Sequence, residues 1–310
     1  MQVIVLKIFQ IWFKLVETVL PVIARKWSVN LFFSPMRFKR PFREEAFVKK
    51  AQISKIPFQI NLTELYNLEW AKGKVLNKQF NQNTDKTFYT LYELGEGPVV
   101  LLVHGWSGRA SQMGSIATAL ADKGFKTITF DAFAHGSSPG KQTTVLEFVK
   151  IIKNIHEKFG PFEAIVGHSL GGIAAGKAIT EGVECKNLIT IGSPTTMNFI
   201  LEAFGKIINA SSTTQNYIKT FVEKYARANA SEFSLTNIGQ KLSVPGLLIH
   251  DKNDTEAEYD QALLFEEMWP QGRLVTTEGL GHSRILRDKK VLEIITSFVS
   301  LPVYSEEPIL

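Results

Sequence analysis

The sequence predicts an α/β fold in which a mainly parallel sheet is covered by helices on both faces. From about residue 86 onward, short apolar runs typical of strands alternate with stretches whose apolar residues recur at helical spacing. The run 99–103 is continuously apolar, as expected of a strand that is buried on both faces. Strands that alternate with helices build parallel sheets, because each helical crossover packs against the sheet.

The elements follow one another in a regular order along the chain. We expect strands at 87–94, 99–103, 126–131, 163–167, 188–191, 246–250 and 274–277, with helices near 110–122, 144–158 and 170–181 between them. A long helical interruption lies at 196–240. Thr255 and Glu258 have the spacing of a capping box, which predicts a helix that begins there and ends at Trp269. A terminal helix with apolar residues at 291, 294, 295 and 298 closes the chain.

Composition and charge exclude several classes of protein. The one cysteine, Cys185, cannot form an internal disulfide, so we expect a reducing, cytoplasmic location. The net charge of +5 is concentrated in residues 1–50, which hold ten Lys and Arg against three Glu, whereas the other 260 residues hold 25 basic and 27 acidic side chains. Such even mixing argues against a nucleic-acid surface. Metal-binding, dinucleotide-binding and phosphate-binding motifs are lacking, so we expect no cofactor and no metal.

The N-terminus departs from the rest of the chain. We expect residues 1–56 to form an amphipathic helix (1–24) and a basic linker (25–56), ahead of a second unit at 57–310. The polar residues Lys7, Gln10, Lys14 and Glu17 share one helical face. We expect the apolar face to pack on the chain's own domain or on a second subunit, with the oligomeric state left open. The alternative is peripheral membrane contact through residues 1–50.

The segment 167–172, Gly-His-Ser-Leu-Gly-Gly, matches the pattern G-x-S-x-G. It lies between an expected buried strand and an expected helix. Small residues at Gly167 and Gly171 allow the tight turn that lifts a serine above the edge of the sheet. The following helix directs its N-terminal dipole towards an oxyanion formed there. Ser169 is therefore the candidate nucleophile.

A nucleophilic serine needs a base, and the base needs an orienting acid. Of the six histidines (104, 135, 156, 168, 250 and 282), His282 follows the last expected strand on a glycine-rich loop that can reach over the sheet. The loop after strand 246–250 supplies the acid. We favour Asp254 over Asp251, which directly ends the strand, and place Glu256 third. The backbone N–H groups of Leu170 and Trp106 are the expected oxyanion hole.

Five motifs together resemble the α/β-hydrolase superfamily: His104-Gly105-Trp106, the segment 131–138 (Asp-x-x-x-His-Gly-x-Ser), the 167–172 elbow, the segment 250–254 and Gly281-His282. The segment 279–288 (Gly-Leu-Gly-His-Ser-Arg-Ile-Leu-Arg-Asp) is similar to that of uncharacterised bacterial hydrolases. The resemblance covers residues 87–300 and implies the α/β-hydrolase fold, with Asp254 as the acid, a structural role for His135 and Ser138, and residues 196–240 as a helical cap.

The residues and the resemblance together predict a serine hydrolase. We expect it to cleave a small-molecule carboxylic ester or thioester through an acyl-enzyme, as carboxylesterases and lipases do, with Ser169, His282 and Asp254 as the triad. Two alternatives stay open. The same triad serves an acyltransferase, which differs only in the acceptor. The chain could also be a non-catalytic binding protein with this fold, recruited to a membrane surface.

Overall fold

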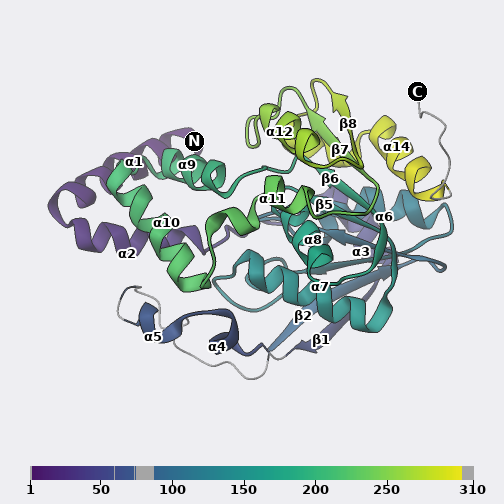
Figure 1. Ribbon diagram of the computed structural model, residues 1–310, viewed down its shortest axis with the longest axis horizontal. Helices are drawn as coiled ribbons and strands as arrows, with labels where there is room; N and C mark the ends of the chain where they lie inside the picture. The colour runs from purple at the N-terminus through teal and green to yellow at the C-terminus, as the bar shows by residue number, and fades with distance from the viewer. Residues whose placement is uncertain (1, 59, 73, 75–86, 302–310) are drawn as a thin grey trace.

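An eight-stranded sheet with the order β1-β2-β4-β3-β5-β6-β7-β8 organises the chain (Figure 1). The computed structural model describes residues 2–58, 60–72, 74 and 87–301. Strand β2 pairs antiparallel with β1 and β4, and every other pairing is parallel. The strands are β1 (Gln52–Phe58), β2 (Thr87–Leu94), β3 (Val99–Val103), β4 (Lys126–Asp131), β5 (Phe162–His168), β6 (Cys185–Ile191), β7 (Gly246–Asp251) and β8 (Gly272–Thr277).

Helices cover both faces of the sheet, each over its own apolar core. One face packs against α3 (Glu45–Lys50), α6 (Gly114–Ala121) and α14 (Lys289–Ser300). The other packs against α7 (Val145–Phe159), α8 (Leu170–Thr180), α11 (Leu235–Gly239) and α12 (Asp260–Met268). The mainly parallel sheet covered on both faces, expected from the alternating apolar runs, is confirmed.

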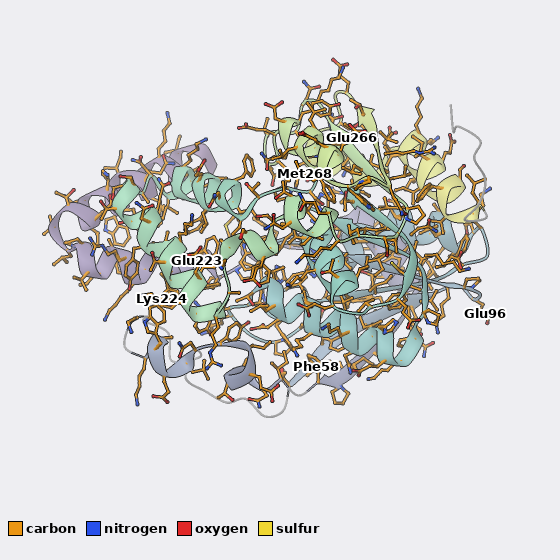
Figure 2. All side chains as sticks on the ribbon, in the orientation of Figure 1. Phe58, Glu96, Glu223, Lys224, Glu266 and Met268 are labelled. Carbon is orange, nitrogen blue, oxygen red and sulfur yellow. The ribbon has the colours of Figure 1, made fainter. Side chains whose placement is uncertain are left out.

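A helical insertion separates β6 from β7. It contains α9 (Met197–Ile208), α10 (Ser212–Ala226), a 3-10 turn (Ala230–Phe233) and α11. Figure 2 labels Glu223 and Lys224 on α10. The carboxylate of Glu223 accepts a hydrogen bond from the backbone of Ala230, and Lys224 lies 5.7 Å from the ring centroid of Trp70 in α5 (Leu68–Ala71), which follows α4 (Leu62–Leu65). The contact between Lys224 and Trp70 joins the insertion to the segment that precedes β2.

Two helices form the N-terminus where we expected one. Helix α1 (Gln2–Val19) ends before Pro21, which begins α2 (Pro21–Phe32), because proline restricts the residue before it to non-helical angles. Both helices lie against α9 and α10, at the left of Figure 1. The expected linker 25–56 instead holds most of α2, α3 and the start of β1, so the expected boundary at residue 56 falls inside a strand. Among the described residues, none of the helices combines the length with the apolar composition that a membrane-spanning helix needs.

The capping box expected at Thr255 and Glu258 does not form. Helix α12 begins at Asp260, and residues 255–258 form a loop. Instead, the N–H groups of Glu256 and Ala257 donate to the carboxylate of Asp254, and this local side-chain-to-backbone turn takes the place of a helix start at Thr255.

The loop after β4 is fixed by the carboxylate of Asp131, which is 1% exposed. It accepts hydrogen bonds from the N–H groups of Ala110 (2.7 Å) and Ser137 (2.8 Å) and from the hydroxyl of Tyr92 (3.0 Å). Gly136 has a φ of +44°, and a Cβ there would lie 2.2 Å from the Asp131 carboxyl group. The motif at 131–138 therefore holds a turn, to which Ser138 adds a hydrogen bond from its hydroxyl to the carbonyl of Asp131.

Replacing Asp131 by alanine should lower the free energy of unfolding by about 3 kcal/mol, because three donors lose their acceptor in the protein interior. Urea denaturation measures the loss. The matched control is Asp122→Ala at the exposed C-terminal end of α6, which should change the free energy of unfolding by less than about 0.5 kcal/mol. Equal losses in the two variants would show that Asp131 does not hold the turn.

Candidate active site

Ser169 occupies a strained turn between β5 and α8. Its φ of 52° and ψ of −124° lie in a region that residues other than glycine rarely adopt. The turn is tight because glycines surround it: a Cβ on Gly167 would lie 2.5 Å from the carbonyl oxygen of Gly171, and one on Gly171 would lie 2.3 Å from that of Val103. The N–H of Ser169 donates to the carbonyl of Ile191. The strand-turn-helix geometry expected for this motif is present.

The structure brings His282 and Asp254 together. The Nδ1 atom of His282 lies 2.7 Å from Oδ2 of Asp254. The other carboxylate oxygen accepts hydrogen bonds from the N–H groups of Glu256 (2.8 Å) and Ala257 (3.0 Å), which fix its orientation. In the neutral imidazole, the proton on Nδ1 is donated to Asp254. The lone pair on Nε2 is therefore free to accept a proton. A Cβ on Gly192 would lie 3.2 Å from Asp254 and 3.3 Å from His282, so a glycine accommodates the pair.

The pair has the electrostatics of a base and its orienting acid. Burial alone would lower the pKa of His282, but the hydrogen bond and negative charge of Asp254 outweigh it and raise that pKa above the ordinary histidine value. Burial alone would raise the pKa of Asp254. The hydrogen bond from His282, the histidine's charge and the N–H groups of Ala257 and Glu256 instead lower it. The shift in pKa therefore favours the ionised form of Asp254 and the protonated form of His282.

The two other candidate acids have different surroundings. Asp251 is fully buried, and its carboxylate accepts hydrogen bonds from the N–H groups of Asn253 and Leu280 and from the hydroxyl of Thr277. Those bonds tie the loop after β7 to the loop that carries His282. Glu256 is 68% exposed at its side chain, and its Oε2 lies 3.9 Å from His282 Nε2. Of the three, Asp254 is the one hydrogen-bonded to His282.

His168 has a positioning role that the sequence did not indicate. Its Nε2 lies 3.0 Å from the carbonyl oxygen of His282, so this nitrogen carries the proton and donates it. Burial, reinforced by the charge of His282, lowers the pKa of His168 to about 3, which keeps the ring neutral. The residue next to the candidate nucleophile therefore anchors the backbone of the candidate base. A histidine beside the serine carries no pattern that predicts such a bond.

The remaining histidines hold loops by their Nε2 atoms. The Nε2 atom of His104 accepts a hydrogen bond from the N–H of Ala132, that of His135 from Ser107, and that of His156 from Glu184. The Nε2 atom of His250 donates a hydrogen bond to the carbonyl of Ala257. The bond from His250 to the carbonyl of Ala257 also steadies the loop of the candidate acid, because Ala257 lies in that loop, and His250 Nε2 lies 3.8 Å from Oδ2 of Asp254. These roles agree with the expectation that they do not act as the base.

The two expected oxyanion donors lie on the same cavity as Ser169. Leu170 begins α8, so its N–H has no acceptor within the helix. Trp106 lies on the loop after β3. The next residue, Ser107, has a φ of 57°, donates its N–H to His135 and accepts at its hydroxyl the N–H of Met36. The N-terminal segment thus helps to hold the loop that carries Trp106.

Ser169 and His282 both line a cavity of about 240 Å³. Its walls are mostly apolar and come from elements far apart in the sequence: Phe32 and Phe33 at the end of α2, Phe204 and Ile207 on α9, and Val222 and Tyr225 on α10. No group of three or more His, Cys, Asp or Glu side chains in the described part of the chain is arranged to hold a metal ion. The arrangement suits an apolar group placed beside a serine.

Comparison with known proteins matches the family described as alpha/beta hydrolase fold over residues 98–285. Comparison with curated proteins finds no match. Similar solved structures include the esterase EaEST from Exiguobacterium antarcticum (20% identity, TM-score 0.55, 70% of this chain and 97% of that one). A second is Est1E from Butyrivibrio proteoclasticus with bound ferulic acid (19% identity, TM-score 0.55, 69% of this chain and 93% of that one). A third is the Pyrococcus furiosus esterase Pf2001 (17% identity, TM-score 0.57, 86% of this chain and 94% of that one). At these identities the likeness concerns the fold.

Replacing Asp254 by asparagine should reverse the pKa shift of His282. Without the negative charge, burial dominates and the pKa should fall from above to below the ordinary histidine value. Titration of the histidine side chains by NMR measures this. Asp251→Asn is the matched control and should leave the pKa of His282 raised, because Asp251 bonds to other partners. An unchanged titration in Asp254→Asn would contradict the assigned pair.

Proposed function

The chain belongs to the alpha/beta hydrolase fold family, and we propose that it is a serine hydrolase that cleaves carboxylic esters or thioesters. The observation that carries the proposal is the shared cavity. Ser169 and His282 both line it, and His282 is hydrogen-bonded through Nδ1 to Asp254 at 2.7 Å. Those are the residue types, in the chain order Ser, Asp, His, that nucleophilic acyl transfer requires on this fold.

In the proposed reaction, the Ser169 hydroxyl attacks the carbonyl carbon as His282 Nε2 removes its proton. The imidazolium that forms is stabilised by ionised Asp254, whose effect on the pKa of His282 already favours the charged ring. The carbonyl oxygen becomes an oxyanion, which accepts hydrogen bonds from the N–H groups of Leu170 and Trp106. His282 then gives its proton to the leaving alcohol or thiol, and an acyl-enzyme ester remains on Ser169.

Water completes the cycle. His282 removes a proton from a water molecule that attacks the acyl carbonyl, a second tetrahedral intermediate forms, and its collapse returns the proton to Ser169 and releases the acid. No cofactor takes part in any of these steps. The helical insertion acts as a cap in this proposal, since α9 and α10 supply walls of the cavity.

The apolar walls favour a substrate with an apolar acyl group. Phe204, Ile207 and Val222 offer no hydrogen-bonding side chain to an acyl chain, and the aromatic rings of Phe32 and Phe33 close the cavity beside α2. Three of the similar solved structures carry names or ligands in keeping with ester chemistry: EaEST and Pf2001 are named esterases, and Est1E holds ferulic acid. Both lines support an acyl ester or thioester as the substrate class.

Ser169→Ala tests the proposal. The variant should lose turnover of a p-nitrophenyl ester by about a millionfold, because the nucleophile is absent while the small side chain leaves the turn intact. The release of nitrophenol measures turnover, and circular dichroism verifies the fold. Ser231→Ala, at an exposed position of the insertion, is the matched control and should keep wild-type turnover. Wild-type turnover by folded Ser169→Ala would refute the proposed nucleophile.

A further inference from the structure

Helices α1 and α2 expose an apolar face that the proposed reaction does not use. Of the nineteen exposed large apolar side chains among the described residues, fifteen lie between Ile4 and Phe42. Ile8, Ile11 and Leu15 are 62%, 71% and 62% exposed. Their spacing of three and four residues places them on one stripe of α1. Contiguous apolar surface of this kind marks a binding site on a soluble protein.

Two polar side chains of α1, Gln10 and Glu17, point inward and fix this orientation. The side-chain amide of Gln10 donates to the carbonyl of Ile207 on α9, and the carboxylate of Glu17 accepts hydrogen bonds from the N–H and hydroxyl of Ser211, the N-cap of α10. Phe13 is fully buried against Ile208. The expectation that α1 packs through its apolar face on its own domain or on a second subunit is therefore met only in part: Phe9, Phe13 and Val16 pack towards α9. The apolar stripe at residues 8, 11 and 15 stays uncovered.

The charged side chains of α1 and α2 indicate which partner covers this apolar face. Residues 2–32 carry four basic side chains (Lys7, Lys14, Arg25 and Lys26) and one acid, Glu17, which is 8% exposed and paired with Lys14. Trp12 and Trp27 stack with ring centroids 4.7 Å apart, and Trp12 is exposed. Exposed apolar residues with flanking cations and tryptophan are the composition of a helix that lies in a membrane interface.

We propose that the apolar face of α1 and the start of α2 docks on the surface of a lipid bilayer that contains anionic headgroups. A second copy of the chain fits less well. A two-fold contact brings the same patch of both copies together, so the excess positive charge of one patch would repel the same charge on the other. Anionic lipid instead pairs with those cations while the acyl region receives the apolar stripe.

Docking in this orientation brings the cavity walls to the lipid. Phe32 belongs to α2, and Ile207 is both an exposed residue of α9 and part of the cavity wall. The backbone carbonyl of Ile207 accepts the hydrogen bond from Gln10 of α1. This step rests on the proposed function: the substrate is an acyl ester or thioester that dissolves in the bilayer and enters the cavity from that side.

Flotation of the full chain with vesicles tests the docking. The vesicles contain phosphatidylcholine alone or equal parts of phosphatidylcholine and phosphatidylglycerol. The wild type should float with the anionic vesicles and more weakly with the neutral ones. The triple variant Ile8→Ser, Ile11→Ser, Leu15→Ser should bind the anionic vesicles at least about tenfold more weakly than the wild type. The matched control Ile53→Ser, Leu263→Ser, Leu301→Ser changes exposed apolar residues elsewhere and should float like the wild type.

Each other outcome overturns the docking. Absence of flotation by the wild type, or equal flotation by all three proteins, rejects the patch. A wild-type dimer that becomes a monomer in the triple variant, without flotation, assigns the patch to a second copy.

Hydrolysis assays separate the docking from the proposed function. All three proteins should hydrolyse a water-soluble short-chain ester equally, whereas the Ile8/Ile11/Leu15 variant should be slower on a long-chain ester embedded in anionic vesicles. Flotation without any ester hydrolysis leaves the docking intact and rejects the hydrolase. Equal rates on the embedded ester reject delivery from the bilayer.

Discussion

Ser169 is held in a backbone conformation that costs about 1–3 kcal/mol for a residue with a side chain, and the surrounding structure must supply that free energy. The buried strand β5 fixes one end of the turn and α8 the other, while glycines at 167, 171 and 172 let β3 and β6 approach closely. The mainly parallel sheet with helices on both faces thus supports one serine, which is half-buried and lines the cavity. A larger residue at Gly171 would meet the backbone of β3 and open the turn.

The same edge of the sheet collects every other group of the candidate site. Trp106 follows β3, Asp254 follows β7 and His282 follows β8, so the carboxyl ends of parallel strands deliver all of them. Three hydrogen bonds fix the loop that carries His282. The carboxylate of Asp251 accepts one from the N–H of Leu280, and His168 donates one to the carbonyl of His282. The carboxylate of Asp254 accepts the third from the ring of His282. A base that is fixed at both backbone and side chain keeps its alignment without a ligand present.

Sequence reasoning predicted the parts of this arrangement that chemistry or periodicity dictates. The strands, the turn at Ser169 and the pairing of Asp254 with His282 follow from apolar runs that end in polar loops. It missed β1 because this edge strand is largely exposed and includes Pro57, so it lacks an apolar signal. It also did not predict that only part of the apolar face of α1 is covered, since periodicity separates two faces of a helix but does not say how much of each face meets the insertion. The helix expected at Thr255 begins five residues later, because the carboxylate of Asp254 binds the N–H groups of Glu256 and Ala257 and holds these residues in a local turn.

The central claim is that Ser169 is a nucleophile activated by its surroundings. A fluorophosphonate probe tests this directly, because it phosphonylates only a serine whose hydroxyl is deprotonated by a nearby base and whose product oxyanion is stabilised. Mass spectrometry of the labelled chain locates the adduct. We expect one adduct, on the peptide that contains Ser169, formed by the folded protein and lost on heat denaturation. A folded protein that stays unlabelled, or that is labelled at another serine, would contradict the account.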